Sequence, residues 1–395
     1  MRSLEQIIAI TWLNLRNLPQ RAGSSVVAVI GVAAVVLVFA AVLSMAKGFE
    51  RTMISAGAED TAVIMRSGST SELNSGISND QVVIIAEAPG VLKDGDDSVG
   101  SAELYVIIDV KKRTTNTDAN VPFRGIQKGA FDVRDNVSIV EGRMFEEGKN
   151  ELIVGRSAQQ EFQGLDTGST IRFGQTDWAI VGMFDAGGSV SESELWTDVR
   201  VLQDAYRRGN SFQSVRVRLQ SEDSLETLEA ALDADPRLSM DIMTEKEYYS
   251  GQAEGLSRFI RIIGYPLTIL MGIGAVFGAL NSMYTSVSVR GKEIATLRAL
   301  GFGPLPVIVS TIVESSLLAL VGGVVGGVIA YLAFNGFQVS TLNGASFSQV
   351  VFDFAVTPEL LIDGLKAALI IGVVGGLLPA IRAARLPVAQ ALREL

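Results

Sequence analysis

Four long apolar runs constrain this chain more than any other feature. The first extends from Ser24 to Ala46 without a charged residue, and three more follow after residue 258. At a rise of about 1.5 Å per residue, runs of this length can cross the roughly 30 Å hydrocarbon core of a bilayer as helices. We therefore predict four transmembrane helices, at residues 22–46, 262–287, 305–334 and 360–381.

The residues before the first run carry an apolar stripe that polar residues interrupt. Ile7, Ile8 and Leu15 belong to this stripe, and Arg16 follows it directly. This pattern is typical of an amphipathic helix that lies in the membrane interface. We expect residues 1–21 to form such a helix on the cytoplasmic leaflet.

The Lys and Arg residues of the short loops predict the orientation in the membrane, because such residues concentrate in cytoplasmic loops. They lie before the first run, between the second and third, and after the fourth: Arg2, Arg16, Arg21, Arg290, Lys292, Arg298, Arg382, Arg385 and Arg393. The loop 335–359 contains none. We expect a multi-pass protein of the bacterial inner membrane with both termini in the cytoplasm.

Residues 47–258 are then expected to form an extracytoplasmic domain. They hold 36 acidic and 22 basic residues, which gives a net charge near −14 and argues against a nucleic-acid partner. Short strand-like runs alternate with helical ones, so we predict an α+β fold. The run Val215 to Leu219 alternates Val with Arg, which predicts a strand with one solvent-exposed face. The segments 67–77 and 93–100 are expected to be loops.

Composition removes most catalytic chemistry from this chain. It contains no Cys and no His, which excludes thiol nucleophiles, Cys or His zinc sites and Ser-His arrangements. No G-x-x-x-x-G-K-[ST] motif is present, so the chain is not expected to hydrolyse ATP by itself. We predict no catalytic, cofactor or metal site here, and a membrane-bound enzyme is the weakest of the functional hypotheses.

Two motifs near the C-terminus resemble those of the MacB/FtsX-type permeases of ABC transporters. Residues 290–301, Arg-Gly-Lys-Glu-Ile-Ala-Thr-Leu-Arg-Ala-Leu-Gly, are similar to the family's R-x-K/R-E-I-x-x-L/M-R-A-L/V-G signature. Residues 379–393 resemble its closing motif, which here includes Pro379, Arg382, Arg385 and Arg393. One residue fewer precedes Pro387 than in the family pattern. The resemblance implies a MacB-like periplasmic core domain at 47–258 and an FtsX-like permease domain at 259–395.

The resemblance also implies a role for the loop between the second and third spans. A short amphipathic helix there would fit a groove of a separate ABC ATPase dimer, which would hold ATP and Mg, and would transmit its movements. The residues of this coupling helix are Arg290, Lys292, Glu293, Ile294, Leu297, Arg298 and Gly301. Without the resemblance, Arg290, Lys292 and Arg298 are better interpreted as charges that set the topology and contact lipid headgroups.

Glycine pairs and one acidic residue are further candidates within the spans. The glycines recur at small-xxx-small spacing, which permits close helix packing within one chain or between subunits. They are Gly274, Gly278, Gly322, Gly323, Gly326, Gly327, Gly372 and Gly376. Glu314 lies a few residues inside the third span, and a membrane-embedded carboxylate is a functional candidate.

Two functions remain open at this point. The chain could drive export of a drug, peptide, lipid or lipoprotein by mechanotransmission, in which the ATPase moves the outer domain. It could instead be a regulatory permease that activates an extracytoplasmic partner such as a cell-wall hydrolase. Because four spans are few for a pathway, we expect a second permease subunit, identical or related. The resemblance leaves open a periplasmic adaptor of the membrane-fusion type.

Overall fold

A computed structural model describes residues 2–16, 22–221 and 223–387. The fold divides into two compact units. Unit 1 comprises residues 1–47, 259–337 and 354–395, and unit 2 comprises residues 48–258 and 338–353. Helices α2 and α7 contribute residues to both units, because each is continuous across a boundary between them.

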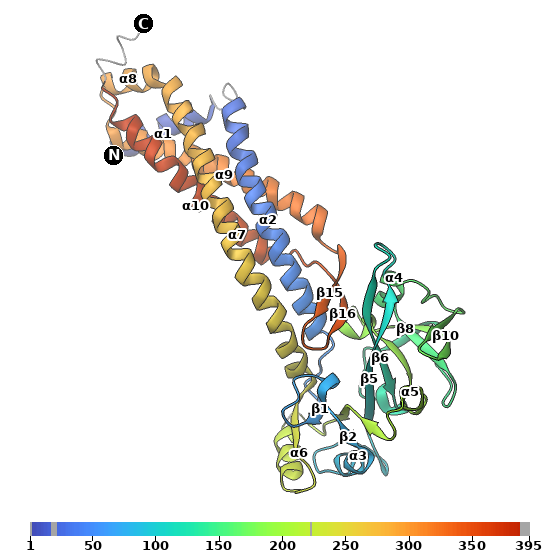
Figure 1. The fold of residues 1–395 in the computed structure, drawn as a ribbon. Coiled ribbons are helices and arrows are strands. Elements are labelled where there is room, and N and C mark those ends of the chain that lie inside the picture. The colour runs from blue at the N-terminus through green and yellow to red at the C-terminus, as the bar shows by residue number, and fades with distance from the viewer. Residues whose placement is uncertain (1, 17–21, 222, 388–395) are drawn as a thin grey trace. The chain divides into compact units, whose positions relative to one another are not determined.

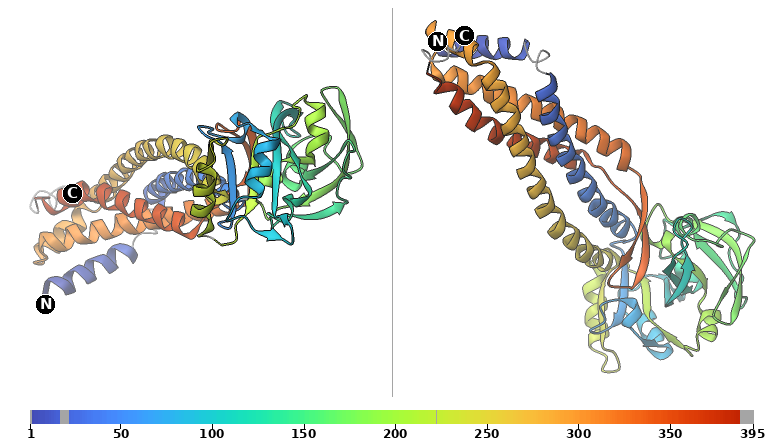
Figure 2. Two further views of the ribbon diagram at one scale, coloured as in Figure 1. Left: turned by 90° about the horizontal axis from the view of Figure 1, so that it is seen from below. Right: turned by 45° about the horizontal axis from the view of Figure 1, so that its top comes forward.

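Unit 1 is a helical bundle (Figure 1). Four helices in the described part of the chain are long and apolar enough to span a membrane, which confirms the predicted fold class. The views of Figure 2 show them running side by side. The helices of the bundle are α1 (Arg2–Arg16), α2 (Ala22–Ile54), α7 (Glu245–Val289), α8 (Gly291–Ala299), α9 (Pro304–Phe334) and α10 (Pro358–Ala384).

Glycines of α9 let its backbone approach α2 closely. A Cβ added at Gly326 would lie 2.3 Å from the carbonyl oxygen of Ala33, and one added at Gly322 would lie 2.7 Å from that of Val29. Both distances are shorter than a carbon and an oxygen can tolerate. Glycine is therefore required at these two positions for α2 and α9 to pack as they do.

Other glycines allow α9 and α10 to approach each other as closely. An added Cβ at Gly323 would lie 2.9 Å from the Cβ of Ala368, and one at Gly376 would meet the side chain of Ser315. By contrast, an added Cβ at Gly274 or Gly278 of α7 would have nothing within 4 Å. Only part of the glycine pattern thus serves packing within this chain.

Helix α1 packs along α9 in unit 1. Ile8 and Trp12 are exposed, whereas Ile10 and Asn14 are buried. Ile10 belongs to a small apolar cluster that also includes Ile294 of α8. The sequence predicted an interfacial helix and did not predict this buried contact with the bundle. Residues 17–21, the end of the predicted interfacial helix, lie outside the described residues.

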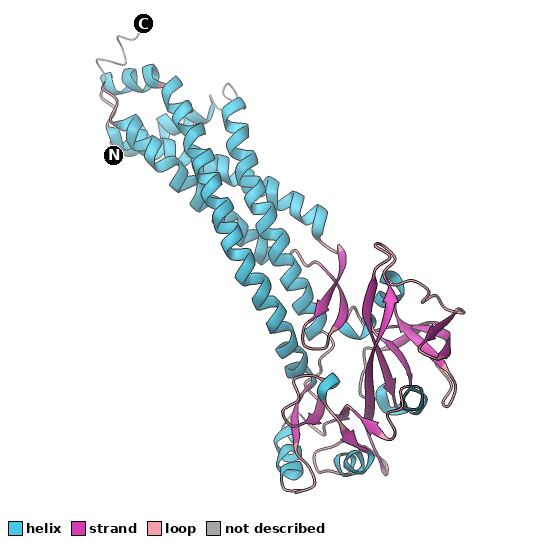
Figure 3. Ribbon diagram, viewed as in Figure 1, coloured by secondary structure: helices cyan, strands magenta, loops and turns pink. Residues whose placement is uncertain are grey.

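Unit 2 is an α+β domain built on one continuous ten-stranded sheet (Figure 3). Neighbouring strands are antiparallel except for the pairs β6–β11 and β8–β10. The strand order is β14 (Met240–Thr244), β1 (Thr61–Arg66), β13 (Ser214–Arg218), β5 (Gly100–Lys111), β6 (Asp118–Ile126), β11 (Leu195–Asp198), β8 (Glu151–Gly155), β10 (Thr176–Asp185) and β7 (Ser138–Gly142), with β9 (Thr170–Phe173) paired to β10.

The shorter elements of unit 2 lie outside this sheet. Its helices are α3 (Asn79–Ala86), α4 (Arg156–Glu161), α5 (Val199–Ala205) and α6 (Ser224–Asp233), and its 3-10 turns are η2 (Glu72–Asn74), η3 (Lys128–Ala130) and η4 (Val190–Ser193). Two-stranded pairs are β2 (Ile77–Ser78) with β12 (Ser211–Phe212), and β3 (Lys93–Asp94) with β4 (Asp97–Ser98).

Alternate residues of the central strands point to opposite faces of the sheet, and the two faces differ in chemistry. Leu104, Phe123 and Val215 belong to the main apolar core, to which α3, α5 and α6 also contribute. The residues beside them, Glu103 and Arg124, are just as buried but charged. Across β13, β5 and β6, one face of the sheet therefore carries the hydrophobic core and the other a buried polar network. Further along that second face, Ile153, Phe184 and Trp196 belong to a separate apolar cluster.

A β-hairpin between α9 and α10 belongs to unit 2, although the sequence predicted only a loop there. Its strands β15 (Gln338–Asn343) and β16 (Ser348–Asp353) pair in antiparallel register. The hairpin is joined to the rest of the unit by hydrogen bonds from Tyr105 Oη to Ser348 Oγ (3.0 Å) and from the Val351 amide to Ser193 Oγ (2.9 Å). Unit 2 thus contains two separate stretches of the chain.

Gly326→Ala is expected to lower the melting temperature of the chain, because its methyl group would collide with the backbone of α2. Overpacking of this kind costs about 1–3 kcal/mol. The matched variant Gly274→Ala adds the same methyl group in open space and should melt at or above the wild-type temperature. Thermal unfolding in detergent measures both, and a Gly326→Ala variant as stable as wild type would contradict the packing described.

Candidate functional site

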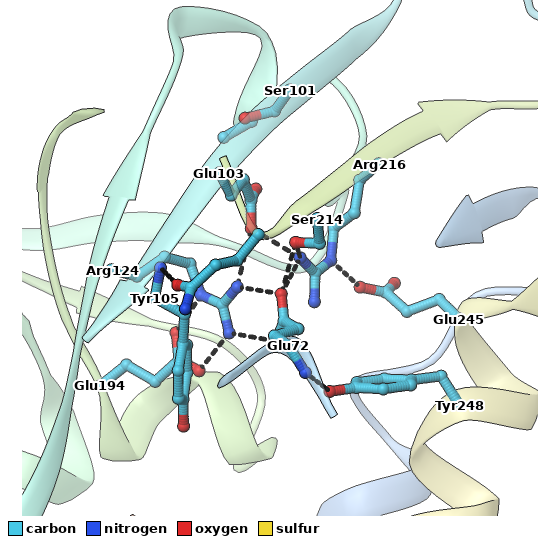
Figure 4. A network of polar contacts seen from close by, with 12 residues as sticks. Glu72, Ser101, Glu103, Tyr105, Arg124, Glu194, Ser214, Arg216, Glu245 and Tyr248 are labelled. Carbon is cyan, nitrogen blue, oxygen red and sulfur yellow. Dashed lines mark hydrogen bonds and ion pairs between the residues drawn. The ribbon is translucent and has the colours of Figure 1, made fainter. Parts of the chain in front are cut away.

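Seven charged side chains meet on the buried polar face of the sheet in unit 2. Figure 4 labels all of them except Arg134. We call this set the charge cluster. Each member is at least 95% buried. The charge cluster consists of Glu72, Glu103, Arg124, Arg134, Glu194, Arg216 and Glu245. Its four carboxylates and three guanidinium groups come from η2, β5, β6, β13, the start of α7 and the loops beside them.

Arg124 donates to three of these carboxylates. Its Nε and Nη2 atoms bind the two oxygens of Glu194 at 2.7 Å each, a bidentate geometry. Its Nη1 atom lies 2.7 Å from Glu72 Oε1 and 2.9 Å from Glu103 Oε2. The guanidinium also stacks over the ring of Tyr105, 4.8 Å from the centroid. These hydrogen bonds replace the ones that the Arg124 guanidinium would make with water if it were exposed.

Arg216 joins the sheet to the first turn of α7. Its Nη1 atom binds Glu103 Oε2 at 2.6 Å and Glu72 Oε1 at 2.8 Å, while its Nε atom binds Glu245 Oε1 at 3.0 Å. Tyr249, one turn further along α7, accepts a hydrogen bond from Nη2 at 3.4 Å. Arg216 therefore holds the first turn of α7 against the sheet, in addition to the direct chain connection from β14.

The side chain of Arg216 corrects one prediction. The Val-Arg alternation of β13 predicted a solvent-exposed face, but Arg216 is 0% exposed. The prediction was wrong because the second face of this strand is covered by the carboxylates of the charge cluster instead of water.

The neighbouring arginines lower the pKa of two carboxyl groups of the charge cluster, Glu103 and Glu72. Burial alone would raise the pKa of Glu103, but Arg134, Arg216 and Arg124 hold it at about 2. Burial likewise opposes ionisation of Glu72, whose pKa nevertheless lies well below its ordinary value because of Arg124 and Arg216. Carboxyl groups that hold no proton near neutral pH are poor general acids. Glu103 and Glu72 are therefore unsuited to acid catalysis.

Sequence reasoning missed the charge cluster, although one signal was available. Glu103 and Arg124 each interrupt an otherwise apolar strand, and charged residues are almost never fully buried unless paired. Glu72 carried no such signal, since it lies in the Ser- and Gly-rich segment 67–77 that the sequence marked as a loop. Among the described residues, no group of three or more potential ligands could hold a metal ion.

The second candidate site is the loop helix α8 in unit 1. Arg290, directly before it, is buried and donates from Nη1 to Glu314 Oε2 of α9 at 2.9 Å. At the other end, Arg298 Nη1 donates to the carbonyl oxygens of Ala384 (2.8 Å), the last residue of α10, and of Leu386 (2.9 Å), just after it. Helix α8 is thus fixed to both α9 and α10.

The remaining residues of the α8 region divide into a buried and an exposed face. Ile294 is buried, and Leu297 is half-buried against the same apolar cluster. Lys292 and Glu293 are exposed. Gly301 follows the C-terminal residue of the helix with φ +96°, a conformation that favours glycine.

The C-terminal motif places its residues around the same end of the bundle. Pro379 is buried inside α10, and Arg382 lies over the ring of Tyr284 at 5.5 Å from the centroid. Arg385 caps α10 and is exposed. Arg393 lies outside the described residues.

The comparisons with known proteins match this architecture. Residues 25–235 match the model of the MacB-like periplasmic core domain, which covers more than half of the chain. The chain belongs to the MacB/FtsX-type permease family. Residues 267–388 match the FtsX-like permease C-terminal model. This member of the family is an ABC transporter permease, a multi-pass membrane protein with an extracytoplasmic domain.

Three relatives illustrate the match. The macrolide export ATP-binding/permease protein MacB 1/2 of Paracoccus denitrificans is 24% identical over 70% of this chain and 42% of its own length. The uncharacterized ABC transporter permease YknZ of Bacillus subtilis is 25% identical over 70% of each chain. The pyoverdine export ATP-binding/permease protein PvdT of Pseudomonas entomophila is 26% identical over 78% of this chain and 49% of its own length. The chain thus spans less than half the length of the two ATP-binding/permease relatives.

Arg216→Met is expected to destabilise unit 2 strongly. Removing one partner from a buried ion pair leaves uncompensated buried charge, which costs about 3–5 kcal/mol. The matched variant Arg237→Met breaks an exposed pair with Asp235 and should change stability little. Trp178 and Trp196 are fully buried in unit 2, so denaturation followed by tryptophan fluorescence reports on this unit. Equal stability of the two variants would rule out a structural role for the charge cluster.

Acidification should destabilise unit 2 through Glu103. Its pKa of about 2 in the folded state lies below the ordinary 4.5. Ionised Glu103 therefore makes its full contribution to the free energy of unfolding above about pH 4.5. This contribution is lost as the pH falls toward 2, by on the order of 3 kcal/mol at full protonation. Glu103→Gln should melt lower at pH 7 but lose less stability between pH 5 and 3. Fluorescence melts across this range measure the slope, with the exposed Glu87→Gln as a control, and an unchanged slope in Glu103→Gln would refute the assignment.

Proposed function

We propose that this permease couples ATP hydrolysis by a separate ABC ATPase to movement of its extracytoplasmic domain, and that this movement extrudes a substrate. In this proposal the ATPase dimer holds ATP and Mg and docks on α8. The permease lies in the bacterial inner membrane, with both termini in the cytoplasm. The observation that carries the proposal is the attachment of α8 to α9 and α10 through buried Arg290 and half-buried Arg298.

A docking helix must not move independently of the spans that it is to push. Arg290 and Glu314 form a buried ion pair, and an arginine pairs with a carboxylate in a directional way. Arg298 adds two hydrogen bonds to backbone oxygens. These oxygens have no side-chain rotamers and move only with the backbone at the end of α10. Displacement of α8 would therefore displace α9 and α10 with it.

The face of α8 that remains available to a partner carries Glu293, Thr296 and Leu300. All three are exposed, and Leu300 is 73% exposed. An apolar side chain between polar neighbours suits a helix-in-groove contact with another protein. Leu297, which lies on the inner face, contributes to packing instead.

Helix α7 offers the route from this loop to unit 2. It ends at Val289, directly before Arg290, and begins at Glu245, a member of the charge cluster. A continuous helix that is fixed at both ends transmits displacement along its axis better than a flexible linker does. The charge cluster would then move unit 2 together with the first turn of α7.

The identity of the cargo follows from no single residue. Relatives named for export of a macrolide and of pyoverdine favour export of a small amphiphilic or peptide-like substrate over regulation of a hydrolase. ATP turnover by the reconstituted permease and ATPase, screened against drugs, peptides, lipids, lipoproteins and adaptor proteins, distinguishes the two. Stimulation by a cell-wall hydrolase alone would reject export. A second permease subunit, identical or related, completes the proposed assembly, and the mass of the solubilised complex tests it.

Glu293→Lys and Leu300→Asp are each expected to reduce substrate-stimulated ATP turnover about tenfold or more, because they alter the exposed face of α8. If the variants act by weakening the docking contact, a tenfold weaker affinity for the ATPase corresponds to about 1.4 kcal/mol of binding free energy. Tryptophan fluorescence melts of unit 2 should match wild type. The measurement is ATP turnover of the purified complex together with co-purification of the ATPase.

The control for these variants is Val83→Asp, which places the same charge on an exposed apolar position of α3 in unit 2. It should retain wild-type turnover and ATPase binding. Full turnover and complex formation in both α8 variants would remove the docking role from this helix.

A further inference from the structure

A cleft at the end of α7 and α10 has no role in the coupling proposal. Its volume is about 580 Å³, and it lies within unit 1. Lys292 and Arg382 line it together with Tyr284 and Ser288. In the described part of the chain, neither cation forms an ion pair. Two positive charges beside hydroxyl groups make this cleft complementary to an anion with oxygen acceptors.

The apolar surface leading to this cleft identifies the kind of anion. On α7, Ile273 and Phe277 precede Tyr284 at helical spacing, and both are exposed. On α10, Val374 and Leu378 precede Arg382 at the same four-residue spacing, and they are exposed as well. Both apolar stripes belong to helices that are long enough to span a membrane.

The two stripes lie on neighbouring helices. A Cβ added at Gly375 of α10 would lie 2.7 Å from the Cβ of Ala279 of α7, so the helices approach closely at this level. Exposed apolar side chains thus lead along α10 to Arg382, whereas on α7 the exposed Asn281 separates Phe277 from the cleft. A ligand that matches this surface needs a hydrocarbon tail as well as an anionic head.

We propose that this cleft binds one anionic phospholipid. Its phosphate lies between Lys292 and Arg382, and an acyl chain follows the stripes on α7 and α10. Basic pockets between transmembrane helices bind anionic headgroups in this way. The lipid would contact α8 through Lys292 and α10 through Arg382.

The test uses the full chain without its ATPase, so that its outcome is independent of the coupling proposal. Delipidated protein in detergent is titrated with phosphatidylglycerol, and native mass spectrometry counts the lipids retained. One phosphatidylglycerol should bind per chain in preference to phosphatidylcholine. Arg382→Gln and Lys292→Gln should each weaken this binding about fivefold, the effect of one basic residue near an anionic headgroup.

Two controls separate charge from folding. Lys366→Gln removes the same charge near the other end of α10, where Lys366 pairs with Asp363, and should bind lipid as wild type does. Arg382→Lys keeps the charge and should retain binding. Equal retention of phosphatidylcholine, or unchanged binding by both Gln variants, would overturn the proposal. Displacement of the lipid by inorganic phosphate at equal concentration would show a free-phosphate site and overturn it as well.

Discussion

The buried ion pairs of the charge cluster determine how unit 2 is held together. Moving a charged group out of water costs several kcal/mol, and only complete pairing and hydrogen bonding offset this cost. Arg124 and Arg216 meet that requirement by binding carboxylates from four different parts of the chain. Displacing Glu245 would leave Arg216 with fewer partners, so the same energetics that stabilise the sheet fix the position at which α7 begins.

The sequence predicted the membrane part of the fold well, because hydropathy along the chain is a local property. The four spans and the α+β class of the inserted domain are confirmed. The β15–β16 hairpin was not predicted, since its short strands pack on residues more than 150 positions away. Arg216 was assigned to a wet face for a similar reason: alternation shows that two faces differ, and does not show what covers each.

The helical structure of the proposed coupling segment was predicted, whereas its contacts were not. The coupling helix was expected at α8, and its residues do form a helix there. Sequence gave no means to see that Arg290 pairs with Glu314, because the two belong to different helices and only the fold brings them together. Leu297 was expected on an interaction face, whereas its half-buried side chain packs against the apolar cluster of unit 1. Spacing identifies a helix, and its neighbours decide which side is free.

The hairpin of unit 2 has a consequence for how the protein is made. The ribosome synthesises residues 48–258 first, and the hairpin emerges only after α7, α8 and α9. Until then, Ser193 and Tyr105 lack the partners that the hairpin supplies. Domains generally fold in the order of their synthesis, but this one cannot finish before the third span has entered the bilayer. Folding of unit 2 outside the membrane is therefore completed only after the third span has inserted into the membrane.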